Sequence, residues 1–341
     1  SIFPGGRFPE MSEKKVRWGI ISTAHISNWG FIPAFKQTLR GELVAVASRD
    51  QSTGEEFAGR HEIPKVFDSY SAMLESDEID AVYNPLPNSM HAEWTAEAAK
   101  YGKHVFCEKP LAATSAEVAQ MAAACKDAGV LLFEAFVFKC HPQSLKLREL
   151  IAGGAIGKLV QMQAHFSFFL ERPTDNIRMN KELAGGSLMD AGCYPITFAR
   201  YVYGREPVSL MAQCRIDPDY GVDTRASIVL DFGADAQASL VLGFDAPSGS
   251  GAMIFGEDGY ISVPGPYHPG EQSAFTVHNG DDVETFSFAT GTMPFAPAIE
   301  HFNDCILDGK ELMVQAGSAA GTMDIIAATL ESSRSGRRIE L

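Results

Sequence analysis

Residues 16–27, with the sequence VRWGIISTAHIS, decide the fold class of this chain of 341 residues. Residues 16–22 form an apolar run typical of a buried strand, and small residues then lead into a helical pattern over residues 26–39. A strand that turns directly into a helix is the first unit of a parallel sheet covered by helices. The pattern repeats, and we predict further strands at 43–48, 79–84, 104–107 and 130–135, and further helices at 89–101 and 115–128.

The pattern changes after Pro142, which suits the first turn of a helix that we expect to end near Ala152. Polar and apolar side chains then alternate over residues 158–168 and in parts of 208–215, 225–231 and 236–242, and helical patterns follow at 296–307 and 318–332. Alternation of period two predicts strands with one buried and one exposed face, as in an open antiparallel sheet. We therefore predict an α/β fold with a parallel-sheet domain (14–140) and a C-terminal α+β domain (141–341) built on a large open, mostly antiparallel sheet.

Composition argues against several classes of partner. The chain has 28 Lys and Arg against 43 Asp and Glu, and its net charge of −15 repels nucleic-acid phosphates and anionic membrane surfaces. The most apolar run, residues 130–138, is too short to cross a membrane and contains Glu134. The six cysteines are scattered without metal-ligand spacing, so we expect no metal, reduced thiols and a cytoplasmic location. Residues 1–10 lack a signal-peptide core and are left out of the fold argument, since Met11 is an alternative start.

The turn after the first strand has the spacing of a dinucleotide-binding loop. Ser22, Ala24 and Ser27 stand at the three glycine positions of the pattern G-x-G-x-x-G. Small residues there allow backbone amides to approach a pyrophosphate at a helix N-terminus. We therefore predict a Rossmann domain in which NAD or NADP is bound by Ser22, Thr23, Ala24, His25 and Ile26. Any strand-to-helix turn favours small residues, so this match needs support from other positions.

The end of the second strand favours NADP. Ser48 and Arg49 stand where a Rossmann fold meets the adenosine ribose. An arginine can bind a 2′-phosphate in a bidentate manner, whereas an acidic residue at this place would bind both ribose hydroxyls of NAD. NAD remains an alternative cofactor, because the acidic residue Asp50 follows one position later. Arg49 could also be an ordinary solvent-exposed charge without a role in binding.

Three separate segments resemble the Gfo/Idh/MocA family, the group of glucose-fructose oxidoreductase and inositol dehydrogenase. They are CEKPL at residues 107–111, YNPLPNSMH at residues 83–91, and GGSLMDAGCY at residues 185–194. The resemblance runs from Val16 onward and is weakest after about Gly233. It implies a Rossmann domain followed by a mixed domain with a large open sheet, which agrees with the periodicity.

The resemblance also implies roles for individual residues. Lys109 would orient the substrate hydroxyl near the nicotinamide, Asp190 would lie beside it, and Tyr194 would exchange the proton. The family's cofactor loops correspond here to Leu86, Asn88, His91, Glu108, Lys109 and Pro110. The substrate contacts that we expect are Lys109, Phe136, His141, Arg178, Asp190 and Tyr194. Each has a structural alternative: Lys109 and Glu108 could form a surface ion pair, and His91 could pack on its helix. Phe166 is assigned to the core or a subunit contact, because it lies on an alternating strand.

Tyr194 stands where many family members have His. A phenol titrates near pH 10, so we expect a nearby cation, Lys109, to stabilise its ionised form. Tyrosine here, with WGIIS at 18–22 and EAF at 134–136, resembles the branch of dimeric dihydrodiol dehydrogenases and NADP-dependent D-xylose dehydrogenases.

The resemblance implies an NADP-dependent dehydrogenase or reductase that acts on a hydroxyl-bearing carbon of a sugar or related polyol. The alternatives are a dihydrodiol or carbonyl reductase on cyclic non-sugar substrates, and a non-catalytic NADP sensor that regulates transcription. We expect a homodimer or homotetramer through the C-terminal sheet. The sensor is disfavoured because Lys109, Asp190 and Tyr194 are all present.

Overall fold

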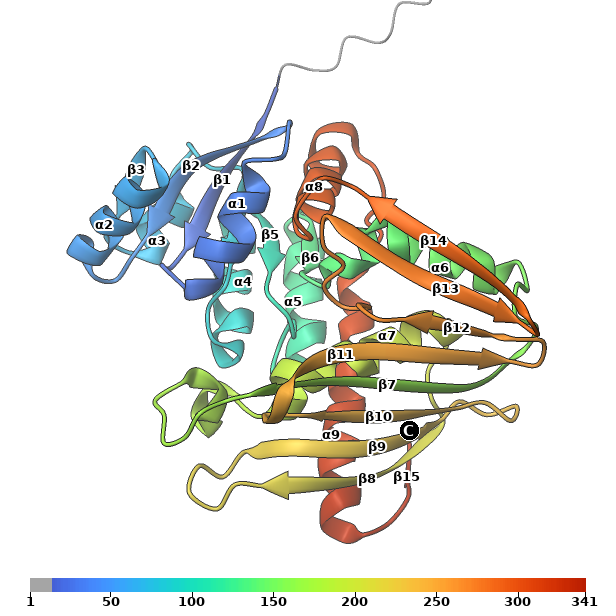
Figure 1. Ribbon diagram of the computed structural model, residues 1–341. Coiled ribbons are helices and arrows are strands. Elements are labelled where there is room, and N and C mark those ends of the chain that lie inside the picture. Colours follow the sequence, from blue (N-terminus) through green and yellow to red (C-terminus); the bar gives the residue numbers. More distant parts are fainter. Residues whose placement is uncertain (1–13) are drawn as a thin grey trace, which may run out of the picture.

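The computed structural model describes residues 14–341, and its first sheet is that of a Rossmann fold. The six strands are all parallel and lie in the order β3-β2-β1-β4-β5-β6 (Figure 1). This order is that of dinucleotide-binding sheets, so the predicted fold class is confirmed. The strands are β1 (Val16–Ile21), β2 (Gly41–Ala47), β3 (Lys65–Phe67), β4 (Ala81–Asn84), β5 (His104–Cys107) and β6 (Leu132–Glu134).

The helices of this part follow the predicted pattern with one omission. A π-helical turn at Ser27–Phe31 continues into α1 (Ile32–Phe35), and α4 (His91–Lys100) and α5 (Ser115–Asp127) follow. Sequence analysis did not predict the unit of α2 (Gln51–His61), β3 and α3 (Tyr70–Glu75). Its signal is weak, because β3 has only three residues, all half-buried, and α2 is mostly polar.

The second sheet has nine strands in the order β14-β13-β12-β11-β7-β10-β9-β8-β15. Only the pair β7 and β10 is parallel, so the sheet is mostly antiparallel as predicted. Residues 245–289 add four strands that sequence analysis missed, because small residues such as SGSG at 248–251 break the apolar alternation. The strands are β7 (Leu159–Phe169), β8 (Ser209–Ile216), β9 (Asp223–Asp231), β10 (Gln237–Gly243), β11 (Asp245–Gly256), β12 (Tyr260–Val263), β13 (Gln272–Asn279), β14 (Asp282–Ala289) and β15 (Ile339–Glu340).

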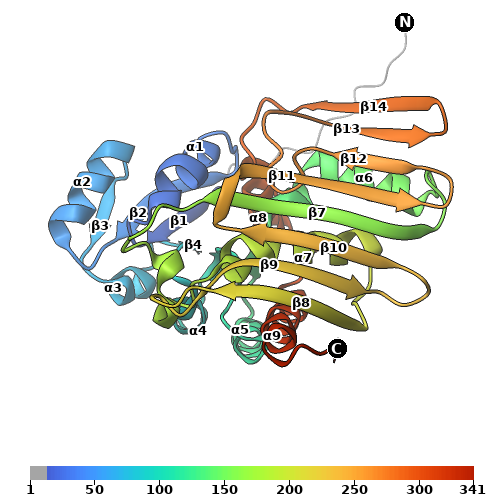
Figure 2. The same ribbon diagram turned by 60° about the horizontal axis from the view of Figure 1, so that its bottom comes forward.

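Helices cover one face of this sheet and leave the other open. Figure 2 shows α6 (Pro142–Ala152) and α7 (Cys193–Tyr203) behind the strands and α9 (Ala319–Ser335) next to β8, and the other face of the sheet is uncovered. Met211, Val229 and Val241 on β8, β9 and β10 are exposed by 56%, 44% and 52%. Met211 pairs directly with Val229 in the ladder between β8 and β9. The open face therefore presents an apolar surface. No helix within residues 14–341 is long and apolar enough to cross a membrane.

Helix α8 (Ala296–Asp308) joins the two parts of the molecule, because it packs on the six-stranded sheet although it follows the second sheet in sequence (Figure 1). The Nε1 of Trp18 donates to the Oδ1 of Asn303 over 2.9 Å, and both side chains are fully buried. The ring of Phe302 lies edge-on to Phe106, with centroids 5.7 Å apart. This buried contact joins α8, which follows the second sheet in sequence, to the six-stranded sheet.

Candidate active site

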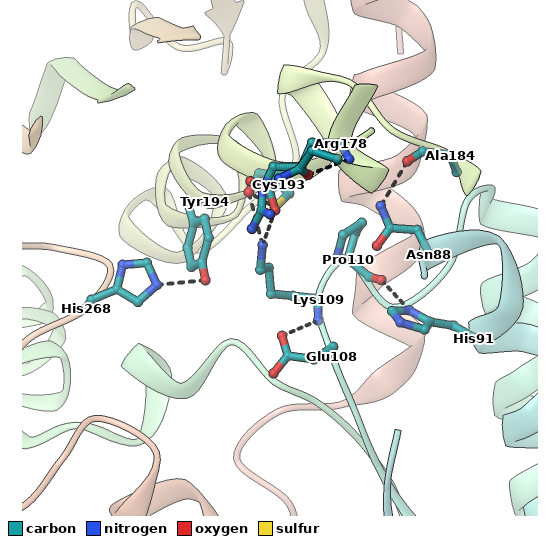
Figure 3. Close-up of polar contacts among 12 residues, drawn as sticks. Asn88, His91, Glu108, Lys109, Pro110, Arg178, Ala184, Cys193, Tyr194 and His268 are labelled. Carbon is teal, nitrogen blue, oxygen red and sulfur yellow. Dashed lines mark hydrogen bonds and ion pairs between the residues drawn. The ribbon is translucent and has the colours of Figure 1, made fainter. Parts of the chain in front are cut away.

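Lys109, Asp190 and Arg178 form a charged cluster where the two parts of the molecule meet (Figure 3). Lys109 follows the end of β5, and Asp190 lies in the π-helical turn Leu188–Gly192 that leads into α7. The Lys109 Nζ donates to the Oδ1 and to the backbone oxygen of Asp190, each over 3.1 Å. The Nε of Arg178 donates to the Oδ2 of Asp190 over 2.6 Å. The structure therefore brings Lys109 together with Arg178 and Asp190, which lie far from it in sequence.

The charges of this cluster stabilise one another. Burial by itself raises the pKa of Asp190, but Lys109 and Arg178 outweigh it and lower this pKa to about 2. Burial likewise disfavours the Lys109 ammonium, but Asp190 raises the pKa of Lys109 above its usual range. Both groups are therefore charged at neutral pH. A substrate oxygen that reaches Lys109 meets a fixed ammonium group.

Two glycines explain how Arg178 reaches Asp190. A Cβ on Gly185 would lie 2.5 Å from the backbone oxygen of Arg178, and a Cβ on Gly186 would lie 2.4 Å from a carboxylate oxygen of Asp223. Gly186 also has a φ of +115°, which side chains rarely tolerate. The Gly-Gly pair thus lets the loop pass close to the segment of Arg178 and bring its guanidinium beside Asp190.

Tyr194 projects from the first turn of α7 beside this cluster, and its oxygen bonds to His268 rather than to Lys109 (Figure 3). The Lys109 Nζ lies 4.8 Å from the centroid of the Tyr194 ring, over its face. The Tyr194 Oη forms a hydrogen bond of 2.8 Å with the Nε2 of His268. Phe136 and Phe166 lie edge-on to the ring, with centroids 5.4 and 5.3 Å away.

The expected ionisation of Tyr194 by Lys109 needs correction. Burial raises the pKa of the Tyr194 phenol, and the opposing effect of the Lys109 ammonium is too small to offset it. The net pKa therefore lies above the usual value of a tyrosine, not below it. At neutral pH the side chain is a protonated phenol that can donate a hydrogen bond.

Hydrogen bonds from Tyr83 and His91 and within the turn itself stabilise the Glu-Lys-Pro turn of residues 108–110. The hydroxyl of Tyr83 donates to the Oε1 of Glu108 over 2.6 Å, and the backbone nitrogen of Lys109 donates to the other Glu108 oxygen over 3.2 Å. The Lys109–Pro110 peptide bond is cis. The His91 ring is fully buried between the backbone oxygens of Leu86 and Pro110, at 2.7 and 3.0 Å. His91 therefore joins the loops after β4 and β5.

The loop after β1 has the backbone of a pyrophosphate site. Ser22 has a φ of +78°, the conformation that glycine usually supplies at this turn, and its nitrogen donates to the backbone oxygen of Ala47 over 2.9 Å. The helix that follows has no side-chain cap at Ile26, so backbone amides of the turn are not bound by a capping side chain. Of the other loop residues, His25 accepts a hydrogen bond from the exposed Trp29 indole over 3.0 Å. These features fit a dinucleotide pyrophosphate.

The end of β2 fits a 2′-phosphate better than a free ribose. The carboxylate of Asp50 caps α2, where it accepts from the Thr53 nitrogen over 2.7 Å and from the Ser52 hydroxyl over 2.8 Å. Hydrogen bonds from Thr53 and Ser52 lower the pKa of Asp50 to about 2. Asp50 is therefore a carboxylate that accepts hydrogen bonds from the first turn of α2. Arg49 is exposed, and within residues 14–341 no carboxylate forms an ion pair with it. The group available to a ligand here is therefore cationic.

The structure places the other predicted site residues in varied positions. The Nδ2 of Asn88 donates to the backbone oxygen of Ala184 over 2.9 Å and so connects the loop after β4 with the second part (Figure 3). Phe136 is fully buried, and its ring packs edge-on against the Tyr194 ring. His141 caps α6 by accepting from the Gln143 nitrogen over 3.1 Å. The structure gives His141 this local contact and does not bring it into the Lys109 cluster.

Sequence analysis did not predict the contacts of Tyr194 with His268, Tyr267 and Phe166. His268 lies in the Pro- and Gly-rich loop between β12 and β13, where neither periodicity nor a motif marks it. Phe166 was assigned to the core or a subunit contact from its strand alternation, yet its half-buried ring contacts both Tyr194 and His268. The available signal was weak: a histidine between a tyrosine and a proline, in a loop of the kind that often carries functional side chains.

The fold and the cluster define an oxidoreductase with a dinucleotide-binding domain, and comparison with known families agrees. A profile described as an oxidoreductase family with an NAD-binding Rossmann fold matches residues 16–136. A profile of the GFO/IDH/MocA C-terminal domain matches residues 144–262. The chain belongs to the Gfo/Idh/MocA oxidoreductase family, and the resemblance deduced from its motifs is confirmed.

Individual relatives cover nearly the whole chain. The chain is 36% identical over 326 residues to a D-xylose 1-dehydrogenase (NADP⁺) of Haloferax volcanii, covering 95% of this chain and 99% of the relative. It is 33% identical to a trans-1,2-dihydrobenzene-1,2-diol dehydrogenase of Xenopus laevis, over 86% and 90% of the two chains. A crystal structure of a 3-ketoreductase from Actinomadura kijaniata with NADP and TDP-benzene superimposes with a TM-score of 0.87 at 28% identity, over 94% and 98%.

Proposed function

We propose that this chain is an NADP-dependent dehydrogenase or reductase that acts on a hydroxyl-bearing carbon of a sugar or related polyol. The observation that carries the proposal is the junction itself: a fixed ammonium, Lys109, and a protonated phenol, Tyr194, lie together beside the end of β5. Ligands of doubly wound sheets bind at the carboxyl ends of the strands, so the substrate meets the dinucleotide here.

NADP is the cofactor that the chain's own residues favour. Ser22 and the uncapped turn after it would hold the pyrophosphate, and Ser48 and Arg49 would hold the 2′-phosphate. Asp50 caps α2, which removes the acidic side chain that an NAD ribose would need. The relatives named as NADP enzymes or crystallised with NADP support this choice.

Lys109 and Tyr194 would both act on the substrate oxygen, Lys109 as a fixed positive charge and Tyr194 as the proton-transfer group. When bound, NADP supplies or accepts the hydride at its nicotinamide ring. Lys109, held by Asp190 and Arg178, would orient the oxygen and stabilise negative charge that develops on it. Tyr194 would give its proton to this oxygen in carbonyl reduction, and in alcohol oxidation it would take the proton of the substrate hydroxyl as its own phenol proton leaves.

One observation keeps the dihydrodiol or carbonyl reductase as a second candidate. Phe166 borders the Tyr194 ring and is only half-buried, and such an apolar side chain suits the face of a carbocycle as well as that of a pyranose. A named dihydrodiol dehydrogenase among the relatives supports this candidate. The sensor alternative has no such support, because Lys109, Asp190 and Tyr194 are assembled as a unit.

A substrate panel tests the proposal. Purified enzyme is given aldoses, polyols and a cyclic trans-diol, each with NADP⁺ and with NAD⁺, and reduced cofactor is followed by absorbance. We expect turnover of at least one sugar or polyol with NADP⁺ and weaker turnover with NAD⁺. Turnover of the cyclic diol alone would select the second candidate. Dinucleotide binding without turnover of any substrate would instead favour a sensor.

We further propose that the open sheet face joins subunits and that the protein is cytoplasmic. Met211, Val229 and Val241 are an exposed apolar group on adjacent strands, which fits a subunit contact. All six cysteines are buried and unpaired, which fits a reducing compartment. The variant Val229→Glu should lower the mass measured by light scattering, and an unchanged oligomer would place the contact elsewhere.

A further inference from the structure

The hydrogen bond between Tyr194 and His268 is a feature of the site that the proposed mechanism does not yet use. The Tyr194 Oη and the His268 Nε2 are 2.8 Å apart, and their ring centroids are 4.7 Å apart (Figure 3). Phe166 lies against both rings, at 5.3 Å from Tyr194 and 5.8 Å from His268. The two side chains are thus held as a pair on the side of the phenol away from Asp190.

Lys109 does not occupy the position that a proton acceptor of the phenol would need. Its Nζ lies over the face of the Tyr194 ring and donates to Asp190. An ammonium has no lone pair and cannot accept a proton. The imidazole of His268 is the group that contacts the phenol oxygen and can accept.

The pKa shifts of the pair place a proton on the phenol and leave the imidazole neutral. Desolvation by the surrounding protein, aided by the Lys109 ammonium and opposed by Asp190, lowers the pKa of His268 to about 4. The ring is therefore neutral at physiological pH. Burial keeps Tyr194 protonated under the same conditions. A neutral imidazole with a free Nε2 and a protonated phenol form a donor-acceptor pair.

The difference in solvent exposure between Tyr194 and His268 indicates the direction in which a proton would leave the site. Tyr194 is 7% exposed, whereas part of His268 reaches solvent although protein packs around its ring. His268 connects the buried oxygen to the surface.

We propose that Tyr194 and His268 form a proton relay, in which His268 takes the Tyr194 proton while Tyr194 takes the proton of the substrate hydroxyl. The proposal rests on the proposed function of this site. In alcohol oxidation the hydride leaves the carbinol carbon for NADP⁺, the O–H bond of the substrate breaks, and Tyr194 Oη binds its proton. The original phenol proton moves to His268 Nε2, and the imidazolium then releases its Nδ1 proton to water. In carbonyl reduction the same protons move the opposite way.

His268 acts through Tyr194, so it is a positioning and relay residue, and two substitutions separate these roles. His268→Ala removes both the hydrogen bond and the proton acceptor. His268→Gln can still accept a hydrogen bond from the phenol, but its amide cannot take up a proton near neutral pH. His165→Ala, which removes an exposed histidine on β7, is the matched control.

The test measures single-turnover oxidation of the active sugar with NADP⁺, with imidazole added as a separate arm. We expect both His268 variants to lose on the order of 10²-fold in the rate, with the KM for substrate nearly unchanged. Imidazole should restore much of the rate of His268→Ala, because the exposed site admits it, and should leave His165→Ala unchanged. A His268→Gln enzyme with the wild-type rate would overturn the relay, as would the absence of rescue.

A second readout needs no activity. In ¹⁵N NMR of the ligand-free protein, the His268 signal is assigned by its loss in His268→Gln. We expect a neutral ring with Nε2 unprotonated and hydrogen-bonded at pH 7, and a changed Nε2 shift in Tyr194→Phe. A protonated Nε2 at pH 7 would overturn the relay. If the wild-type enzyme turns over no sugar or polyol, the proposed function fails, whereas an active wild type with fully active His268 variants refutes only the relay.

Discussion

The preference for NADP can be tested at Arg49, which is exposed at the end of β2 without a carboxylate partner within residues 14–341. We predict that Arg49→Gln weakens NADP much more than NAD. A hydrogen bond to a charged group contributes about 1.5–3 kcal/mol, which corresponds to roughly a 10- to 150-fold rise in Kd for NADP. NAD has no 2′-phosphate, so its Kd should change by less than about threefold.

The assay is quenching of intrinsic tryptophan fluorescence by each dinucleotide, supported by kcat/KM with both cofactors. Arg60→Gln is the matched control, because Arg60 is an exposed arginine of the neighbouring helix α2 that pairs with Glu56. It should leave both Kd values unchanged. An equal loss of NADP and NAD affinity in Arg49→Gln would refute the reasoning. Equal or better kcat/KM with NAD in the wild type would refute it too.

Three further predictions concern the junction and the contact between the two parts. Lys109→Met should keep NADPH binding, seen by fluorescence, but lose most turnover, and a near-normal kcat would remove Lys109 from the mechanism. Asn303→Ala leaves the buried Trp18 N–H without a partner and should lower the free energy of unfolding in urea by about 1–3 kcal/mol; no change would mean that this bond contributes nothing. Burial alone raises the pKa of Asp190, but Lys109 and Arg178 lower it to about 2, so its folded pKa lies below the unfolded value. The stability that Asp190 contributes is therefore present above about pH 4 and lost as the pH falls toward 2, and it amounts to about 2 kcal/mol. The difference in unfolding free energy between wild type and Asp190→Asn should shrink over this range; a constant difference would contradict the assigned pKa.

The parallel sheet could be predicted from the sequence because its strands are short apolar runs that end in recognisable turns. Residues 16–27 are an example, since an apolar strand, small residues and a helix follow one another directly. The unit α2–β3–α3 was not predicted from the sequence, because β3 is short and half-buried and α2 buries few of its residues. Strands β11 to β14 were not predicted either, because small and polar residues interrupt their alternation of apolar and polar side chains.

The charged cluster could be predicted only with the family resemblance. Periodicity does not show that Lys109, Arg178 and Asp190 meet, because their contact depends on how the two parts pack. The position of Lys109 over the Tyr194 ring was not predictable either, and the expected phenolate was wrong as a result. Burial decides the direction of the Tyr194 pKa shift, and burial is a property of the folded chain rather than of a motif.

The role of Tyr194 as the proton-transfer residue is the central claim, and Tyr194→Phe tests it most directly. The variant keeps the ring and its edge-on contacts with Phe136 and Phe166 but lacks the oxygen that bonds to His268. The measurement is the single-turnover rate of hydride transfer with saturating NADP⁺ and the active sugar, beside NADPH affinity. We predict a fall of about 10²–10⁴-fold in the rate with nearly unchanged NADPH affinity. A Tyr194→Phe enzyme with the wild-type rate would contradict the account and assign the proton to another group.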